Sequence, residues 1–381
     1  MIYLDNSATT KPYKEVLETY LTVSEQYFGN PSSLHTLGLE AEKVLTRSRE
    51  LIAKLLGVKA KEVIFTSGGT EGNNLAIKGV SLEHQSRGKH IITSVIEHAS
   101  TYETFAELEN KGFDVTYLPV NQTGHVSLDD LKQAIRSDTI LVSLIHVNNE
   151  TGAVQPIQEI GEFLKDYPKV FFHVDHVQGV TKVPVHFKKN NIDLCTISGH
   201  KFHGLKGTGA LYVREGITLS PMLHGGVQEA RLRAGTENVP GIAALAKALR
   251  MTIEKAEEGK LNLMQLQQKA IAGLKEINGI VLNSGSGDGH APHIVNFSIP
   301  GAKPEVVIQA LSHQQIYVST KSACSSKLSS PSRILLEMGL GQKRAESAIR
   351  ISFSYETQDQ EVEAFIQVMK KEVPKLLQVM R

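Results

Sequence analysis

Short apolar runs and helical patterns alternate along the middle of the chain. Between residues 62 and 214 the runs rich in β-branched and aromatic residues are EVIFTS, KHIITSV, DVTYLPV, TILVSLIHV, KVFFHVDHV, DLCTIS and GALYVR. Several are almost continuously apolar, which is typical of strands covered on both faces by crossover helices. The pattern predicts an α/β fold with a large, mainly parallel seven-stranded sheet. Its ligand should bind beyond the carboxyl ends of the strands.

The last third of the chain mixes helical and strand patterns. Residues 240–275 read as one long helix that could bridge two domains, and GIVLNSGSGDGHAPHIVNFSI after it reads as a hairpin or a pair of strands. A helix over about 303–314, a serine-rich loop, a helix near 341–349, the strand IRISFS and a terminal helix follow. This order predicts a smaller α+β domain.

Two domains also agree with the length of 381 residues. We expect residues 15–255 to form the large domain. Residues 1–14 and 256–381 would form the small domain, with the serine-rich loop at about 318–332.

Composition excludes several classes of protein. The chain is 41% hydrophobic and 21% charged, with a net charge of +1, so no bulk field draws it to nucleic acid or to an anionic membrane. No apolar run approaches the roughly 20 residues that span a bilayer. The start, MIYLDNSATTKPY, does not resemble a signal peptide. Two cysteines cannot build a disulfide framework or a four-cysteine zinc site, and we expect a reduced, cytoplasmic protein.

The first chemical feature is FTSGGTEGNNLAI, a strand followed by a glycine pair and a helix. Gly68 and Gly69 would leave the backbone amides at the helix start open to an anion, with Thr70 beside them. The stretch has neither the P-loop nor the GxGxxG spacing, so an ordinary strand-to-helix turn explains it equally well.

The second feature is FFHVDHVQG. His173, Asp175 and His176 suggest zinc, but strand alternation places His176 on the opposite face from the other two. An aspartate at the end of a core strand needs a cationic or hydrogen-bonding partner, such as a protonated ring nitrogen. The alternative is an aspartate that caps the following turn.

The third feature is TISGHKFHGLKG, in which Lys201 follows a strand and lies near Ser198 and His200. An enclosed lysine can act as a neutral amine in Schiff-base chemistry, whereas an isolated loop lysine is usually a surface residue. An anion cradle, a carboxylate and a Schiff-base lysine, in this order, are what pyridoxal 5'-phosphate requires.

The chain resembles the NifS/IscS-like cysteine desulfurases, which belong to the class V aminotransferase family of fold-type I pyridoxal phosphate enzymes. The resemblance runs through the motifs YLDNSATT, FGNPSSLH, TSGGTEGNN, EHAS, HVNNETGAVQPI, HVDHVQ, SGHKFHGLKG, LRAGTENV and SACSSKLSSPS. It implies a large cofactor-binding domain and a small domain with a mobile loop that carries the catalytic cysteine.

The resemblance also assigns roles around the cofactor. Lys201 would hold the cofactor as a Schiff base, Asp175 would pair with the pyridine nitrogen, and Gln178 would reach the phenolic oxygen. His98 would stack on the ring and move protons. The phosphate would be held by Gly69, Thr70, Ser198 and His200. Thr236 from a second subunit would also reach the phosphate, which implies a homodimer.

Further assignments concern the substrate, L-cysteine. Asn149 and Arg350 would bind it, with the Arg350 guanidinium forked onto its carboxylate. Other readings remain open: His98 as a structural histidine, Asn149 as a turn cap and Arg350 as a surface ion pair. Cys195, within DLCTIS, reads as a small buried hydrophobe.

The resemblance implies that Cys324 would be the nucleophile. Its thiolate would take the substrate sulfur as a persulfide, L-alanine would leave, and the sulfur would pass to an acceptor protein. A loop of small polar residues suits a thiol that must visit the cofactor and then swing out. The acceptor would serve iron–sulfur cluster, thio-tRNA or thio-cofactor synthesis, and the sequence does not identify it.

Two positions depart from the family. Lys321 stands where many relatives have glycine, and a cation there could lower the pKa of Cys324. His176 stands where the family usually has alanine, and the sequence gives it no role.

Two other functions stay open. One is a selenocysteine lyase or another fold-type I enzyme in which Cys324 is dispensable. The other is a non-catalytic protein that binds pyridoxal phosphate and relays sulfur. The intact set of site residues argues against the second.

Overall fold

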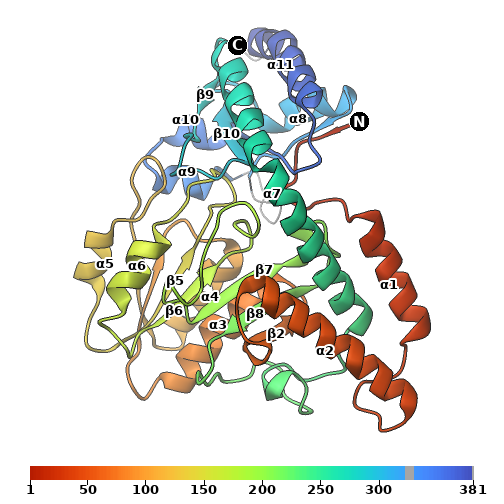
Figure 1. Cartoon of the computed structure of the whole chain (residues 1–381). Coiled ribbons are helices and arrows are strands. Elements are labelled where there is room, and N and C mark those ends of the chain that lie inside the picture. Colours follow the sequence, from red (N-terminus) through yellow and green to blue (C-terminus); the bar gives the residue numbers. More distant parts are fainter. Residues whose placement is uncertain (322–329, 380–381) are drawn as a thin grey trace.

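A computed structural model of the chain describes residues 1–321 and 330–379. They form a broad body around a large sheet and a smaller part above it, near which both termini lie (Figure 1). Within the described residues, no helix combines the length and the apolar character that a bilayer-spanning helix needs.

The large sheet has seven strands in the order β2-β8-β7-β6-β5-β3-β4. β8 runs antiparallel to both of its neighbours, and the strands from β7 to β4 run parallel to one another. The α/β fold with a mainly parallel seven-stranded sheet is therefore confirmed. The strands are β2 (Val63–Thr66), β3 (His90–Ser94), β4 (Asp114–Leu118), β5 (Thr139–Ile145), β6 (Phe171–Asp175), β7 (Leu194–Ser198) and β8 (Gly209–Val213).

Helices cover both faces of this sheet. Successive strand residues enter opposite cores: Ile91 packs with α3 and α4, whereas Ile92 packs with α5 and α6. This alternation explains the continuous apolar runs, because each buried aliphatic side chain contributes about 1.5–3 kcal/mol on either face. The helices are α1 (Lys14–Gln26), α2 (Thr36–Leu56), α3 (Gly69–His84), α4 (Ala99–Asn110), α5 (Leu128–Ala134) and α6 (Ile157–Leu164).

The 37-residue helix α7 (Val239–Lys275) joins the two parts, as Figure 1 shows. Leu245 and Leu249, near its start, lie in the core shared with α1 and α2. Leu263 and Leu274, further along, lie in the core of the smaller part. The Asn238 side chain caps its start by accepting from the Gly241 N–H at 3.0 Å. One helix thus contributes to two hydrophobic cores.

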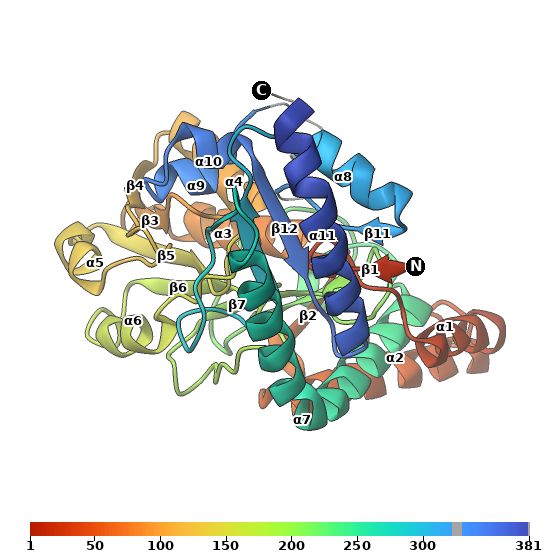
Figure 2. The same cartoon turned by 90° about the horizontal axis from the view of Figure 1, so that it is seen from above.

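The smaller part is built on a three-stranded sheet in which β10 lies between β9 and β12, antiparallel to both. Seen from above, β1 at the N-terminus lies beside β11, and α11 lies against α7 (Figure 2). Its elements are β1 (Ile2–Tyr3), β9 (Val281–Leu282), β10 (Ile294–Ser298), α8 (Pro304–His313), β11 (Ile316–Tyr317), α9 (Arg333–Glu337), α10 (Gln342–Glu346), β12 (Ala348–Ser352) and α11 (Asp359–Val379).

The predicted pair of strands after residue 279 is confirmed, but the helix near 341–349 is too long. It ends at Glu346, and β12 begins at Ala348 because that segment pairs with β10 over its whole length. Short 3-10 turns complete the fold at Ala60–Glu62, Gly199–Lys201 and Glu229–Arg231.

Candidate active site

A pocket of about 190 Å³ lies at the carboxyl ends of the parallel strands, where the sequence places the ligand. All of its predicted residues except Arg350 end or follow strands of the large sheet, and Arg350 lies on β12. The predicted residues that line the pocket are Gly69, Thr70, His98, Asn149, Asp175, Gln178, Ser198, His200, Lys201 and Arg350.

Asp175 is the last residue of β6 and is buried. Its Oδ2 accepts from Asn73 Nδ2 at 2.7 Å, and its Oδ1 accepts from the Val177 N–H at 3.0 Å. The carboxylate therefore caps a turn, as the alternative reading proposed, and also faces the pocket. Both bonds fix its orientation before any ligand arrives.

The histidines on either side of Asp175 do not form a metal site. His173 uses both ring nitrogens, on Ser143 at 2.8 Å and Thr196 at 3.0 Å, and burial lowers its pKa to about 3. Among residues 1–321 and 330–379, no cluster of three histidine, cysteine or acidic side chains could hold a metal ion.

His176 instead pairs with His146. Their Nδ1 atoms lie 2.7 Å apart and the rings stack, so one ring donates the single proton that the two share. Gly179 makes room for this pair, because a Cβ at position 179 would lie 2.4 Å from His176 Nδ1. Burial lowers the pKa of both imidazoles and keeps them neutral.

His98 is the N-cap of α4. Its Nδ1 accepts from the Ser100 N–H at 3.2 Å and lies 2.8 Å from Ser100 Oγ, so the ring proton resides on Nε2. Burial lowers its pKa, and the charge of Asp175 opposes this. The ring is therefore neutral and held in one tautomer by its own helix.

Lys201 ends a short turn after β7, and its amine reaches the N-terminal segment. Nζ donates to the carbonyl oxygens of Ser7 at 2.5 Å and Ala8 at 2.9 Å. The carbonyl oxygen of Lys201 accepts from Lys182 Nζ at 2.9 Å. Burial, helped by the charge of Lys201, lowers the pKa of Lys182 to about 7.

The start of α3 has the shape of an anion cradle. Gly68 has a φ of +149°, and a Cβ on Gly69 would lie 2.9 Å from Val177 Cγ2, so side chains are excluded there. The free amides of the first turn lie beside Ser198. His200 is also at this end, and burial lowers its pKa to about 3, so it would meet an anion as a neutral donor.

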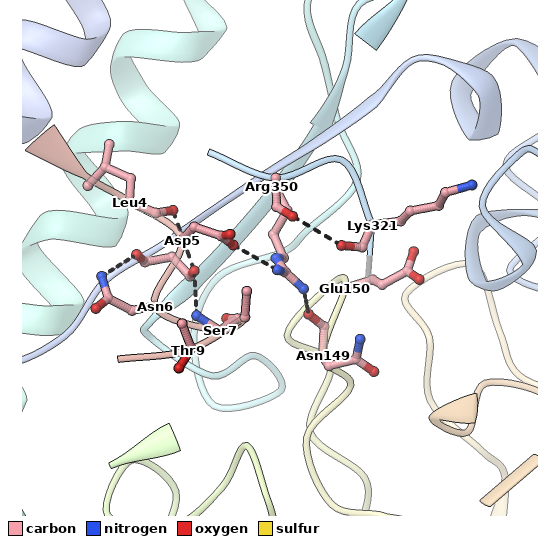
Figure 3. A network of polar contacts seen from close by, with 12 residues as sticks. Leu4, Asp5, Asn6, Ser7, Thr9, Asn149, Glu150, Lys321 and Arg350 are labelled. Carbon is pink, nitrogen blue, oxygen red and sulfur yellow. Dashed lines mark hydrogen bonds and ion pairs between the residues drawn. The ribbon is translucent and has the colours of Figure 1, made fainter. Parts of the chain in front are cut away.

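Arg350 is buried, with 1% of its side chain exposed, so the surface ion pair reading is wrong. Nη1 donates to the Asn149 carbonyl at 2.7 Å and Nη2 to Asp5 Oδ1 at 2.9 Å (Figure 3). The turn in NNETG is capped by Asn148, whose Oδ1 accepts from the N–H groups of Glu150 and Thr151.

Some predicted residues lie elsewhere. Thr236 is exposed in the loop before α7, within a separate pocket that also includes Ser67 and Arg233. Cys324 lies outside the described residues. Lys321 is buried, with its Nζ donating to Ser330, and burial is the main cause that lowers its pKa.

Cys195 is buried, and this raises the pKa of its thiol well above the ordinary value. The interpretation of Cys195 as a small buried hydrophobe is confirmed.

The sequence did not reveal several residues of the pocket. Asn73 joins Asp175 to Ser100, with Nδ2 2.9 Å from Ser100 Oγ, and its place one helical turn after Gly69 was an available signal. Ser7 and Ala8 contribute only carbonyl oxygens, which leave no signal in side-chain chemistry.

Comparison with known proteins gives consistent matches. The family model described as aminotransferase class-V matches residues 2–365. A protein named cysteine desulfurase IscS from Methanosarcina thermophila is 44% identical over 98% of this chain and 92% of its own length. A NifS/IcsS protein homolog from Lactobacillus delbrueckii subsp. bulgaricus is 46% identical over 96% of this chain and 95% of its own.

Solved structures agree with these sequences. A NifS-like protein superposes with a TM-score of 0.92 at 36% identity, covering 98% of this chain and all of that one (100%). A structure described as SspA in complex with cysteine has a TM-score of 0.81 at 34% identity, over 93% and 99% of the two chains.

Proposed function

Because the chain belongs to the class-V aminotransferase family, we propose that it is a pyridoxal phosphate-dependent cysteine desulfurase. It converts L-cysteine to L-alanine and passes the sulfur to Cys324. The observation that carries this function is that Lys201, Asp175 and His98 line one pocket together with the glycine cradle of α3.

The donor set of the pocket fits pyridoxal phosphate. The cradle excludes a Cβ and presents amides to a phosphate, and the oriented carboxylate of Asp175 suits a protonated pyridine nitrogen. Gln178 would reach the phenolic oxygen. When bound, the cofactor supplies an electron sink that makes the Cα–H bond of an amino acid acidic. The phosphate would be held by Gly69, Thr70, Ser198, His200 and the partner subunit's Thr236.

Three residues of the pocket would have different roles in the reaction. Asp175 would meet the pyridine nitrogen with a carboxylate that two hydrogen bonds hold in place. His98 would lie against the ring, with the proton of its neutral imidazole on Nε2. Lys201 would hold the cofactor and, as a neutral amine, would take the proton from the substrate Cα.

The substrate carboxylate binds to Arg350. A buried guanidinium with planar, paired donors suits a carboxylate better than any other side chain. The Asn149 amide would contact the substrate beside Arg350, since the Asn149 carbonyl accepts from Arg350 Nη1 at 2.7 Å and both residues line the pocket.

Sulfur transfer needs a thiolate at Cys324. Its Sγ attacks the substrate sulfur, an S–S bond forms, and the substrate Cβ–S bond breaks with its electron pair left on carbon. Protonation of that carbon and return of a proton to Cα give L-alanine, and Cys324 carries a persulfide. An acceptor protein for iron–sulfur cluster, thio-tRNA or thio-cofactor synthesis then takes the sulfur.

Alanine release from L-cysteine with excess thiol reductant tests this function, with wild type and Cys324→Ser compared. We expect wild type to release alanine and Cys324→Ser to release none, while both keep the yellow colour of the cofactor-loaded enzyme. Equal turnover by Cys324→Ser would favour a selenocysteine lyase or another enzyme that does not need the thiol. A yellow wild type that releases no alanine would favour a non-catalytic relay.

A further inference from the structure

The N-terminal segment joins the edge of β12 directly beside Arg350. The Leu4 carbonyl accepts from the Ser352 N–H at 2.7 Å, and Asp5 forms a parallel bridge with Ser352. The Asn6 side chain donates to the Ser352 carbonyl at 3.0 Å. The first residues of the chain thus form part of the wall that carries the arginine (Figure 3).

Asp5 is held firmly in this position. Its carbonyl accepts from Tyr3 Oη at 3.1 Å and from the Ala8 N–H at 3.0 Å, which closes a turn over Asp5–Ala8. The Ser7 N–H donates to Ser352 Oγ at 2.8 Å. The Asp5 carboxylate therefore meets Arg350 as part of a braced turn and not as a free side chain.

The ion pair fixes Arg350 without using up its donors. Of the five N–H groups of a guanidinium, one on Nη2 goes to Asp5 and one on Nη1 goes to the Asn149 carbonyl. Nε is buried, and within the described residues it has no hydrogen-bond partner. N–H groups therefore remain for a carboxylate in the pocket that Arg350 lines.

The same turn contacts the large sheet. The Ser7 carbonyl accepts from Lys201 Nζ at 2.5 Å and from Gln178 Nε2 at 2.9 Å, and the Ala8 carbonyl accepts from Lys201 at 2.9 Å. Four consecutive residues therefore span the distance between the arginine and the lysine. This turn therefore sets where a substrate carboxylate bound to Arg350 would lie relative to Lys201 Nζ.

We propose that Asp5 is a positioning residue that holds Arg350 ready for the substrate carboxylate. The inference rests on the proposed function. Asp5 itself does not touch the substrate, and it acts by removing the rotational freedom of a buried guanidinium and by stabilising its charge. Loss of Asp5 should weaken carboxylate binding and leave the chemical steps intact.

The test compares Asp5→Ala and Asp5→Asn with wild type. Asp5→Ala should raise KM for L-cysteine about tenfold or more, the value of one charge-assisted hydrogen bond, and change kcat less than about twofold. Asp5→Asn keeps an acceptor oxygen and should recover most of the affinity. Binding of the product L-alanine, followed by the absorbance of the cofactor-loaded enzyme, should weaken in Asp5→Ala by the same factor as KM.

Cysteamine, which lacks the carboxylate, is the matched control ligand. Asp5→Ala should leave the binding of cysteamine unchanged, because cysteamine has no carboxylate for Arg350 to bind. Equal losses for cysteamine and L-alanine would show general damage to the pocket and overturn the inference, as would an unchanged KM for L-cysteine. Should Asp5→Ala not fold, Asp5→Leu, which removes the acceptor at a similar side-chain volume, decides in the same two-ligand comparison. Failure of the proposed function would appear separately, as a wild type that releases no alanine.

Discussion

Lys182 is a buried cation directly behind the proposed cofactor lysine. Its Nζ donates to the carbonyl oxygen of Lys201, and burial lowers its pKa from 10.5 to about 7. The folded protein therefore binds this proton more weakly than the unfolded chain does. Between about pH 7 and 10.5 the unfolded state holds more protons, so the contribution of Lys182 to stability rises with pH.

We predict that Lys182→Met removes this pH dependence. The free energy of unfolding of wild type should rise from pH 7 to pH 10 relative to that of Lys182→Met, because the variant has no proton to lose. Urea denaturation at pH 7, 8.5 and 10 measures the difference. Parallel pH profiles for the two proteins would contradict the low pKa of Lys182.

The proposed site residues that the sequence could indicate are those whose residue type suggests a chemical role. Lys201 and Gly69 follow strands and Asp175 ends one, and an amine, a residue without a side chain and a carboxylate each suggested a role before any geometry was known. Ser7 and Ala8 could not be found in this way, because they act through carbonyl oxygens that every residue possesses. The role of Asp5 could not be predicted for another reason: its partner Arg350 lies 345 positions away in the sequence, so no local pattern connects the two residues.

Helix α9 is short, yet it braces the loop that carries His98. Arg333 donates to the carbonyl oxygens of Val95 and Glu97, the latter at 2.7 Å, and its guanidinium lies 4.0 Å from the centre of the Tyr102 ring. Glu97 is buried, which raises its pKa to about 8. The segment between β3 and α4 thus depends on a residue from the far end of the chain.

We predict that Arg333→Ala lowers kcat/KM about tenfold, because a small displacement of His98 is costly in a site that works by positioning. Arg344→Ala is the matched control. Arg344 also makes two bonds, to Asn283 Oδ1 at 2.8 Å and the Leu282 carbonyl at 2.7 Å, but it lies away from the pocket. Both variants should melt at lower temperature, and only Arg333→Ala should lose activity; equal activity losses would refute the bracing role.

The apolar runs predicted the buried strands, and the helical pattern over residues 240–275 predicted the long helix. Both predictions succeeded because burial on two faces and helical periodicity are strong local signals. The predicted helix near 341–349 was too long. The local sequence suits a helix, but pairing with β10 places Ala348 and Ile349 in a strand. Helix α9 was not predicted, although Ser332 Oγ accepts from the Leu335 N–H at 3.2 Å as an ordinary cap.

In the proposed homodimer, a second copy of the chain would enter the site through Thr236. This residue is exposed on its own subunit, in a loop outside the pocket that holds Lys201. The proposed homodimer therefore predicts an effect that appears only when two different variants are combined in one dimer.

We predict that two inactive variants complement each other. Lys201→Ala lacks the amine, and Thr236→Val should bind the phosphate poorly when cofactor is limiting. In a hybrid dimer, purified by two different tags, the Lys201→Ala subunit lends its Thr236 to the intact Lys201 of the other. Such a hybrid has one complete site in two, so about half the wild-type activity should return. Hybrids as inactive as their parents would contradict a shared site.

The pairing of Asp5 with Arg350 also has a consequence for protein synthesis. During translation, Asp5 is among the first ten residues to be made, whereas Arg350 is made only when the chain of 381 residues is almost complete. All seven strands of the large sheet are synthesised within that interval, before the strand edge on which the turn over Asp5–Ala8 rests. A polypeptide stalled before β12 would therefore carry Lys201 and the glycine cradle but would lack Arg350, the proposed site of the substrate carboxylate.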